Sequence, residues 1–169
     1  TAFNIGTASY DSVAFNIGPQ ESGPQGLAFN PTGTKMFVCG TSGQDVNEYT
    51  LSSAFNVGTA SFVDAFSVSA QDTFPSALAF NTDGTVMLVL GQTGDAVYSY
   101  SLTSGFDVST ASFSNSFSVS SQATAPTGIA FSATGSSFII CCSATDYIYE
   151  YTSQSVTFVT GYNPVHTTN

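Results

Sequence analysis

Few residues in this chain have the types and spacing that catalysis needs. The only histidine, His166, follows the last of three sequence repeats. A Ser/His/Asp or Cys/His arrangement would need the C-terminal tail to reach back into the fold. The eleven acidic residues are scattered, and no motif pairs two of them as in a glycosidase. We therefore predict no catalytic residues, no metal ligands and no cofactor, and we do not expect an enzyme.

The three cysteines do not indicate a disulfide or a metal site. Cys39 and Cys141 occupy the same position in two repeats, and Cys142 follows directly. A pair separated by a whole repeat unit exceeds the ~7 Å Cα limit for a disulfide, and a bridge between neighbours would distort the peptide between them. No CxxC pattern or paired histidine accompanies them. We expect free thiols, with Cys39 and Cys141 as small buried hydrophobes.

Two sets of polar residues recur once per repeat and are candidate ligand loops. The first lies four residues before a repeated proline, and the second lies in a polar loop. Their members are Gln20, Gln71 and Gln122, and Gln44, Asp95 and Asp146. The first set can bond backbone groups of a crossover or can form a ring of identical ligand contacts. The second set favours an Asx-turn, with a weak calcium site as the alternative.

These positions share a register because the chain contains three copies of a 51-residue repeat. The repeated positions include Pro24, Pro75 and Pro126, and Tyr49, Tyr100 and Tyr151. Self-similarity at a fixed period of this length is typical of repeat architectures, in which each copy is one structural unit.

Each copy predicts four short strands and no helix. Apolar residues alternate or form short β-branched and aromatic runs, bounded by Gly, Asn, Asp and Ser. In the first copy we expect strands at 27–30, 36–40, 46–51 and 61–68, with counterparts 51 residues later. The turns NPTG, NTDG and SATG place Gly33, Gly84 and Gly135 where φ is positive. Four antiparallel strands in about fifty residues make one propeller blade. We predict an all-β, β-propeller-type repeat of three four-stranded antiparallel blades.

The motif of one copy also resembles known propellers. The run PQGLAFNPTGTKMFV, followed by a polar loop and VNEYTL, resembles blades of the YVTN and NHL-type β-propellers. It is also similar to tandem arrays in proteins of marine bacteria and their phages, whose units end in EYTL and continue into AFNVGTASF-like segments. The likeness extends through Thr152. It implies the fold and no particular function, because propellers host unrelated activities.

A single repeat domain over residues 1–169 is expected. Its parts are a lone outer-strand segment at 1–23, blades at 24–74 and 75–125, an incomplete blade at 126–163 and a tail at 164–169. Three blades are fewer than the four to eight of a closed propeller. We expect either an excerpt of a longer protein, or subunits that close a ring or stack into a fibre.

The N-terminal segment is the expected donor in such an assembly. Residues 3–17 would add a strand to residues 148–152 of the third blade of a neighbour. The expected interface residues are Phe3, Ile5, Tyr10, Val13, Phe15, Ile17, Ile148, Tyr149 and Tyr151. We expect residues 1–18 to hydrogen-bond to a neighbouring subunit or to the rest of a longer chain, and not to the blade that follows them.

Composition narrows the partners. One Lys, no Arg and eleven acidic residues give a formal net charge of -10, which repels nucleic-acid phosphates and anionic membranes. We expect self-association or contact with a longer chain, with surface glycans as a further partner, and neither nucleic acid nor membrane insertion. The predicted role is a structural or adhesive protein of an extracellular, cell-surface or virion setting. A carbohydrate-binding propeller lectin and a propeller hydrolase or lactonase are the alternatives.

Overall fold

The computed structural model describes residue 6, residues 8–132 and residues 137–152, which form three antiparallel sheets. The first sheet contains β1 (Pro24–Phe29), β2 (Lys35–Gly40), β3 (Asp45–Leu51) and β4 (Ala60–Ser67). The second contains β5 (Pro75–Phe80), β6 (Val86–Gly91), β7 (Ala96–Leu102) and β8 (Ala111–Ser118). The third contains β9 (Pro126–Phe131), β10 (Ser137–Cys142) and β11 (Tyr147–Thr152). Two single-turn 3-10 helices, η2 (Val57–Thr59) and η3 (Val108–Thr110), precede β4 and β8. None of the described helices is long and apolar enough to cross a membrane.

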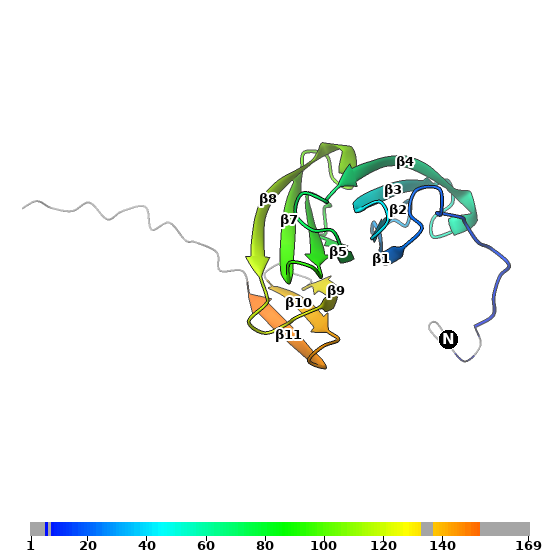
Figure 1. Ribbon diagram of the computed structural model, residues 1–169. Helices are drawn as coiled ribbons and strands as arrows, with labels where there is room; N and C mark the ends of the chain where they lie inside the picture. Colours follow the sequence, from blue (N-terminus) through cyan, green and yellow to red (C-terminus); the bar gives the residue numbers. More distant parts are fainter. Residues whose placement is uncertain (1–5, 7, 133–136, 153–169) are drawn as a thin grey trace, which may run out of the picture.

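The three sheets are consecutive blades, which we name blades 1, 2 and 3 in chain order. Strands follow chain order within each blade, and Figure 1 shows the blades fanning out from β1, β5 and β9. The all-β prediction is confirmed. The inner strand begins three residues earlier than expected because Pro24 pairs with Gly40 across a bulge.

The turn between the first two strands depends on glycine in blades 1 and 2. Gly33 and Gly84 have φ values of 69° and 74°, in the left-handed region that a Cβ disfavours. A Cβ at either position would also collide with a ring, that of Phe55 or Phe106. The positive-φ prediction is confirmed at these two positions. Gly135 lies outside the described residues.

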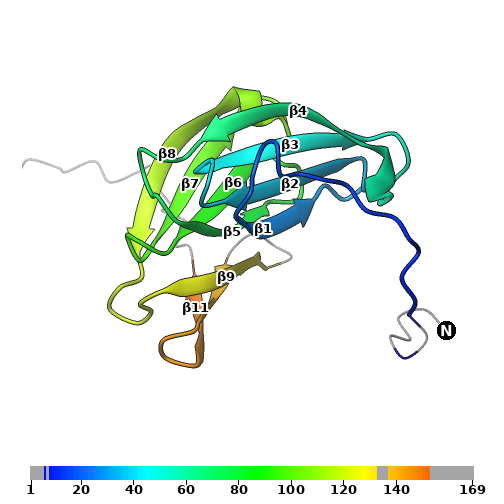
Figure 2. The ribbon, with the colours of Figure 1, turned by 45° about the vertical axis from the view of Figure 1, so that its right-hand side comes forward.

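Among the described residues, two of the three buried hydrophobic clusters lie between blades, and the third lies on blade 1 where Phe15 and Ile17 pack against it. Because side chains alternate across a strand, each sheet has one face toward the preceding blade and one toward the following blade. We call these the upstream and the downstream face. Figure 2 shows blade 1 lying against blade 2, and buried clusters fill the spaces between blades 1 and 2 and between blades 2 and 3.

Candidate functional site

The contact between blades 1 and 2 shows how one blade covers the next. Phe37, Cys39 and Val46, on the downstream face of blade 1, are fully buried. Blade 2 contributes Leu78, Met87, Val89, Tyr100, Leu102 and Val108 to the same cluster. The centroid of the Phe37 ring lies 4.5 Å from that of Phe80. Removal of this apolar surface from water, at about 25 cal/mol per Å², is the main stabilising term between blades.

A buried polar contact also joins blades 1 and 2. Lys35 Nζ donates to Glu48 Oε1 and to the Phe106 carbonyl, each at 2.6 Å. The backbone N–H of Val108 donates to Glu48 Oε2 at 3.0 Å. Glu48 is buried. Its carboxylate accepts hydrogen bonds from both blades, and these bonds offset the cost of burying a charge. The matching positions are Val86 and Ser99 in blade 2, and Ser137 and Glu150 in blade 3.

The downstream face of blade 3 carries the same repeat positions, but they are exposed. Ile148 is 75% exposed, whereas its counterpart Val46 is fully buried. Ile139 is 36% exposed, whereas its counterpart Phe37 is fully buried. Cys141, the counterpart of Cys39, is exposed as well. No described residue covers this face in the way that blade 2 covers blade 1.

The upstream face of blade 1 is open at its inner strand. Leu27 is 62% exposed, whereas its counterpart Leu78 in blade 2 is 5% exposed. Further out on the same face, Phe15 and Ile17 pack against a cluster that contains Tyr49. The two ends of the described blades are therefore unlike, and each lacks a neighbour over part of its surface.

The end of the N-terminal segment packs on blade 1 as the end of β4 packs on blade 2. The Phe15 and Tyr49 rings meet edge-on at 5.6 Å, just as Phe66 meets Tyr100 at 5.4 Å where β4 leads into blade 2. Residues 8–17, however, are not in a strand. Among the described residues, their backbone hydrogen bonds are those that Gln20 and Glu21 donate to the Ile17 carbonyl. Side chains, and not a β-ladder, hold this segment to blade 1.

The nine expected interface residues divide into four groups. Phe15 and Ile17 pack on blade 1, and Tyr10 and Val13 are exposed. Phe3 and Ile5 lie outside the described residues. The remaining three, Ile148, Tyr149 and Tyr151, lie on β11.

The residues of β11 face opposite ways, so the three expected interface residues on this strand do not share one face. Ile148 is on the open downstream face, whereas Tyr149 and Tyr151 pack toward blade 2. Tyr151 stacks on Phe138 at 5.1 Å. One edge of β11 pairs with β10, and the other edge has no strand partner within the described part of the chain. Of the three expected interface residues on β11, only Ile148 lies on the open face.

Two of the three repeated glutamines accept from a tyrosine side chain instead of bonding the crossover backbone. Gln71 Oε1 accepts from the Tyr100 hydroxyl at 3.2 Å, and Gln122 Oε1 accepts from the Tyr151 hydroxyl at 3.4 Å. No such bond forms at Gln20, and the hydroxyl of Tyr49, the counterpart tyrosine, is buried without a hydrogen-bond partner. These contacts fasten each outer strand to the next blade.

Buried carboxylates that the sequence did not single out hold the crossovers. Glu21 accepts from the backbone N–H groups of Gly23, Ser42 and Gly43. Burial opposes the charged form, but these hydrogen bonds outweigh it and lower the pKa of Glu21. Asp72 repeats the arrangement in blade 2. Blade 3 has Ala123 at this position, so a search for residues repeated in all three copies does not find the pair.

The loop set Gln44, Asp95 and Asp146 shares a left-handed backbone conformation, with φ between 46° and 59°. Instead of an Asx-turn, Asp95 Oδ1 accepts from the Ala125 N–H, at the entry to blade 3, at 2.8 Å. Nothing in this geometry gathers oxygens for a calcium ion. Over the described residues, no group of three His, Cys, Asp or Glu could hold a metal ion.

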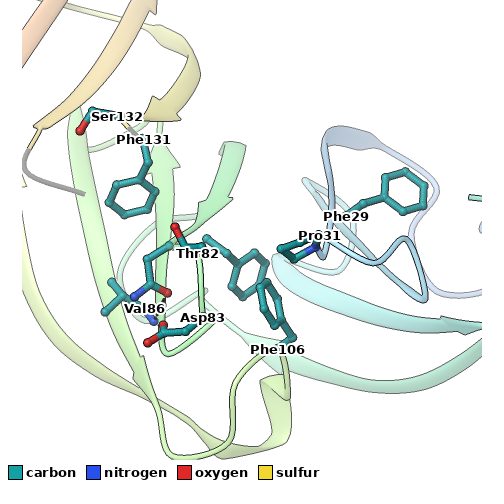
Figure 3. A pocket seen from close by; sticks show the side chains of 10 residues that line it. Phe29, Pro31, Thr82, Asp83, Val86, Phe106, Phe131 and Ser132 are labelled. Atoms are coloured by element: carbon teal, nitrogen blue, oxygen red, sulfur yellow. Dashed lines mark hydrogen bonds between the residues drawn. The ribbon is translucent and has the colours of Figure 1, made fainter. Parts of the chain in front are cut away.

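A hollow of about 620 Å³ opens where the inner strands end. Phe29, Phe80 and Phe131 line it from the same repeat position in the three blades, and Thr82 and Asp83 add polar groups (Figure 3). Hydrogen bonds to Thr85 lower the pKa of Asp83. Asp83 is therefore a carboxylate at neutral pH, held by its own turn.

All three cysteines are free thiols, as predicted. Burial raises the pKa of Cys39 to about 12, with Glu21 and Asp45 adding to the effect. The prediction that Cys141 is a buried hydrophobe is wrong, because it is exposed on the open face of blade 3.

Comparison with solved structures decides the fold. A β-propeller domain from Myceliophteria thermophila is 13% identical with a TM-score of 0.54, over 76% of this chain and 39% of that chain. This chain has the β-propeller fold. A putative 6-phosphogluconolactonase from Bacteroides fragilis is 15% identical with a TM-score of 0.62, over 79% of this chain and 35% of that chain. The periplasmic gluconolactonase of Pseudomonas aeruginosa is 19% identical with a TM-score of 0.59, over 79% of this chain and 36% of that chain.

This propeller chain therefore spans between 35% and 39% of the length of these three structures. No family model matches the chain, and no curated protein matches its sequence. The finer resemblance to YVTN, NHL and phage repeats stays a prediction.

The two lactonase structures contradict the prediction that the chain is not an enzyme. That prediction rested on the position of His166 and on the lack of a paired-acid motif. Propeller blades of the same kind build proteins named as lactonases, so the lack of a recognisable motif excludes no activity. At 15% and 19% identity, the likeness shows the fold and assigns no activity to this propeller.

Proposed function

We propose that the chain is a structural repeat module that completes a propeller by strand sharing. In this role, the N-terminal segment is the outer strand of a blade that belongs to another chain or to another part of a longer chain. The free edge of β11 accepts a strand of the same kind. An adhesive component of an extracellular, cell-surface or virion structure is the setting we propose, since only 7% of residues are charged and the surface is rich in hydroxyl groups.

One observation carries the proposal. Phe15 packs on Tyr49 as Phe66, at the end of an outer strand, packs on Tyr100, but residues 8–17 form no strand of their own. At the other end, β11 has a free edge among the described residues. An exposed edge presents unpaired N–H and C=O groups and invites an added strand.

The repeat register specifies how the two would pair. In blade 1, Val46 lies opposite Phe66 and Thr50 lies opposite Ser61. Phe15 and Tyr10 are the counterparts of Phe66 and Ser61 one repeat earlier. Ile148 and Thr152 are the counterparts of Val46 and Thr50 two repeats later. The same register therefore places Phe15 opposite Ile148, and Tyr10 opposite Thr152. Cross-strand pairs of an aromatic and a β-branched residue are favourable.

A peptide-binding experiment tests this pairing. The receptor is the full chain with Phe15→Asp, whose own donor segment is impaired and whose β11 is unchanged. A fluorescent peptide of residues 8–18 should bind it with saturable anisotropy. Adding Ile148→Asp to the receptor should weaken binding at least tenfold, because a charge then faces Phe15 of the peptide. Equal binding to both receptors would show that β11 does not accept the strand.

A further inference from the structure

We propose that the downstream face of blade 3 packs against the upstream face of blade 1 of a second copy, so that two copies of the three described blades close one six-blade ring. This inference rests on the proposed function and adds the identity of the partner. The two faces are those that the chain already joins between blades 1 and 2, as the matched positions show.

The inner strands show how closely the faces match. A Cβ built at Gly26 would lie 2.7 Å from Cys39 Sγ in its own blade, and 2.9 Å from Ala77 Cα and 3.0 Å from Leu78 Cδ2 in the next blade, so the glycine lets blade 2 approach closely. Blade 3 has Gly128 at the position of Gly26. The open upstream face of blade 1 presents Leu27 at the position of Leu78, and Leu27 is exposed. A second copy can therefore seat Leu27 beside Gly128 in the same way.

The outer part of the contact matches at the glutamate but not at its lysine partner, since Ser137 stands in blade 3 at the position of Lys35. Glu150 is the counterpart of Glu48, which accepts from the Val108 N–H of the following blade. The counterpart of Val108 in blade 1 is Val57. In the ring, Glu150 of one copy faces the Val57 N–H of the other. Ile148 and Ile139, exposed in one chain, would then be covered as Val46 and Phe37 are.

The two faces differ, so the contact is heterologous and joins copies head to tail. Two copies of the three described blades add up to six, which lies within the four to eight blades of a closed propeller. Strand sharing and face packing then occur at the same junction, because residues 8–17 of each copy lie beside β11 of the other.

Mass measurement on complementary variants tests the ring. The wild-type chain should have twice the 17.5 kDa mass of one chain. Leu27→Asp blocks one face and Ile148→Asp blocks the other, and each variant alone should have the mass of a single chain. Mixed in equal amounts, they retain one intact junction and should form a two-chain particle, at least tenfold weaker than the wild type. Ala70→Asp adds the same charge at an exposed crossover position and should leave the wild-type mass unchanged.

The outcomes separate the ring from the proposed function. A single-chain mass for the wild type, another multiple or an open filament overturns the six-blade ring. If the wild type forms a pair but the blocked variants also stay paired, another surface joins the copies. The same conclusion holds if the two blocked variants do not form a pair when they are mixed. If the ring fails but the peptide of residues 8–18 still binds β11, strand sharing stands with a different partner. If the peptide also fails to bind, both proposals fall.

Discussion

The downstream faces of blades 1 and 3 are built from the same repeat positions, yet one is core and the other is surface. Val46 and Ile148 are both β-branched residues at the same point of a third strand. One is fully buried and the other is 75% exposed. Residue type therefore does not decide burial here. The presence of a following blade does, and the open face of blade 3 retains the residues of an interior contact.

The largest expected effect comes from the matched leucines on the upstream faces. Leu78→Ala should lower the free energy of unfolding by about 2–4 kcal/mol, because it leaves a cavity in the buried contact between blades 1 and 2. Leu27→Ala should change it by less than about 0.5 kcal/mol in dilute solution, since Leu27 is exposed there. Urea unfolding below the concentration at which chains associate measures both. Equal losses would mean that the inner edge of blade 1 is already covered.

The two glutamates provide the next comparison. Glu48→Ala should cost about 2–3 kcal/mol, because Lys35 and the Val108 N–H lose a buried charged acceptor. Glu150→Ala should cost less than about 0.5 kcal/mol in the isolated chain, where Glu150 is exposed. Thermal unfolding of dilute protein should rank the two variants in this order. The reverse order would show that the Lys35 and Glu48 pair adds nothing to the junction.

A smaller effect is expected in the turn at Gly84. Gly84→Ala should cost about 1–2 kcal/mol, because its φ of 74° is unfavourable for a residue with a Cβ. Thr82→Ala, at an exposed position of the same turn, is the control and should change stability by less than about 0.5 kcal/mol. Denaturant midpoints compare the two. A neutral Gly84→Ala would mean that the turn relaxes to another conformation.

The repeat made most of the fold predictable, whereas the site was predictable only in part. A strict 51-residue period aligns weak strand patterns, so that Gly33 and Gly84 could be assigned to turns and the strands placed within a few residues. The buried carboxylates Glu21 and Asp72 were missed, because their partners lie about twenty residues away and the third copy has Ala123. The exposure of Cys141 was missed for a different reason. The period identifies positions that face a neighbouring blade, but it does not say whether that blade is present.

Alkylation of Cys141 tests the central claim, that the open face of blade 3 becomes buried when it packs against blade 1 of a second copy. Iodoacetamide labelling at pH 8, read by mass spectrometry, compares the wild-type chain with the Leu27→Asp variant. In that variant the substitution is in blade 1, and blade 3 is unchanged. Cys39 should stay unlabelled in both, since burial raises its pKa to about 12. We expect Cys141 to react at least tenfold more slowly in the wild type at high protein concentration than in the variant. Equally fast labelling of Cys141 in both proteins would contradict the account.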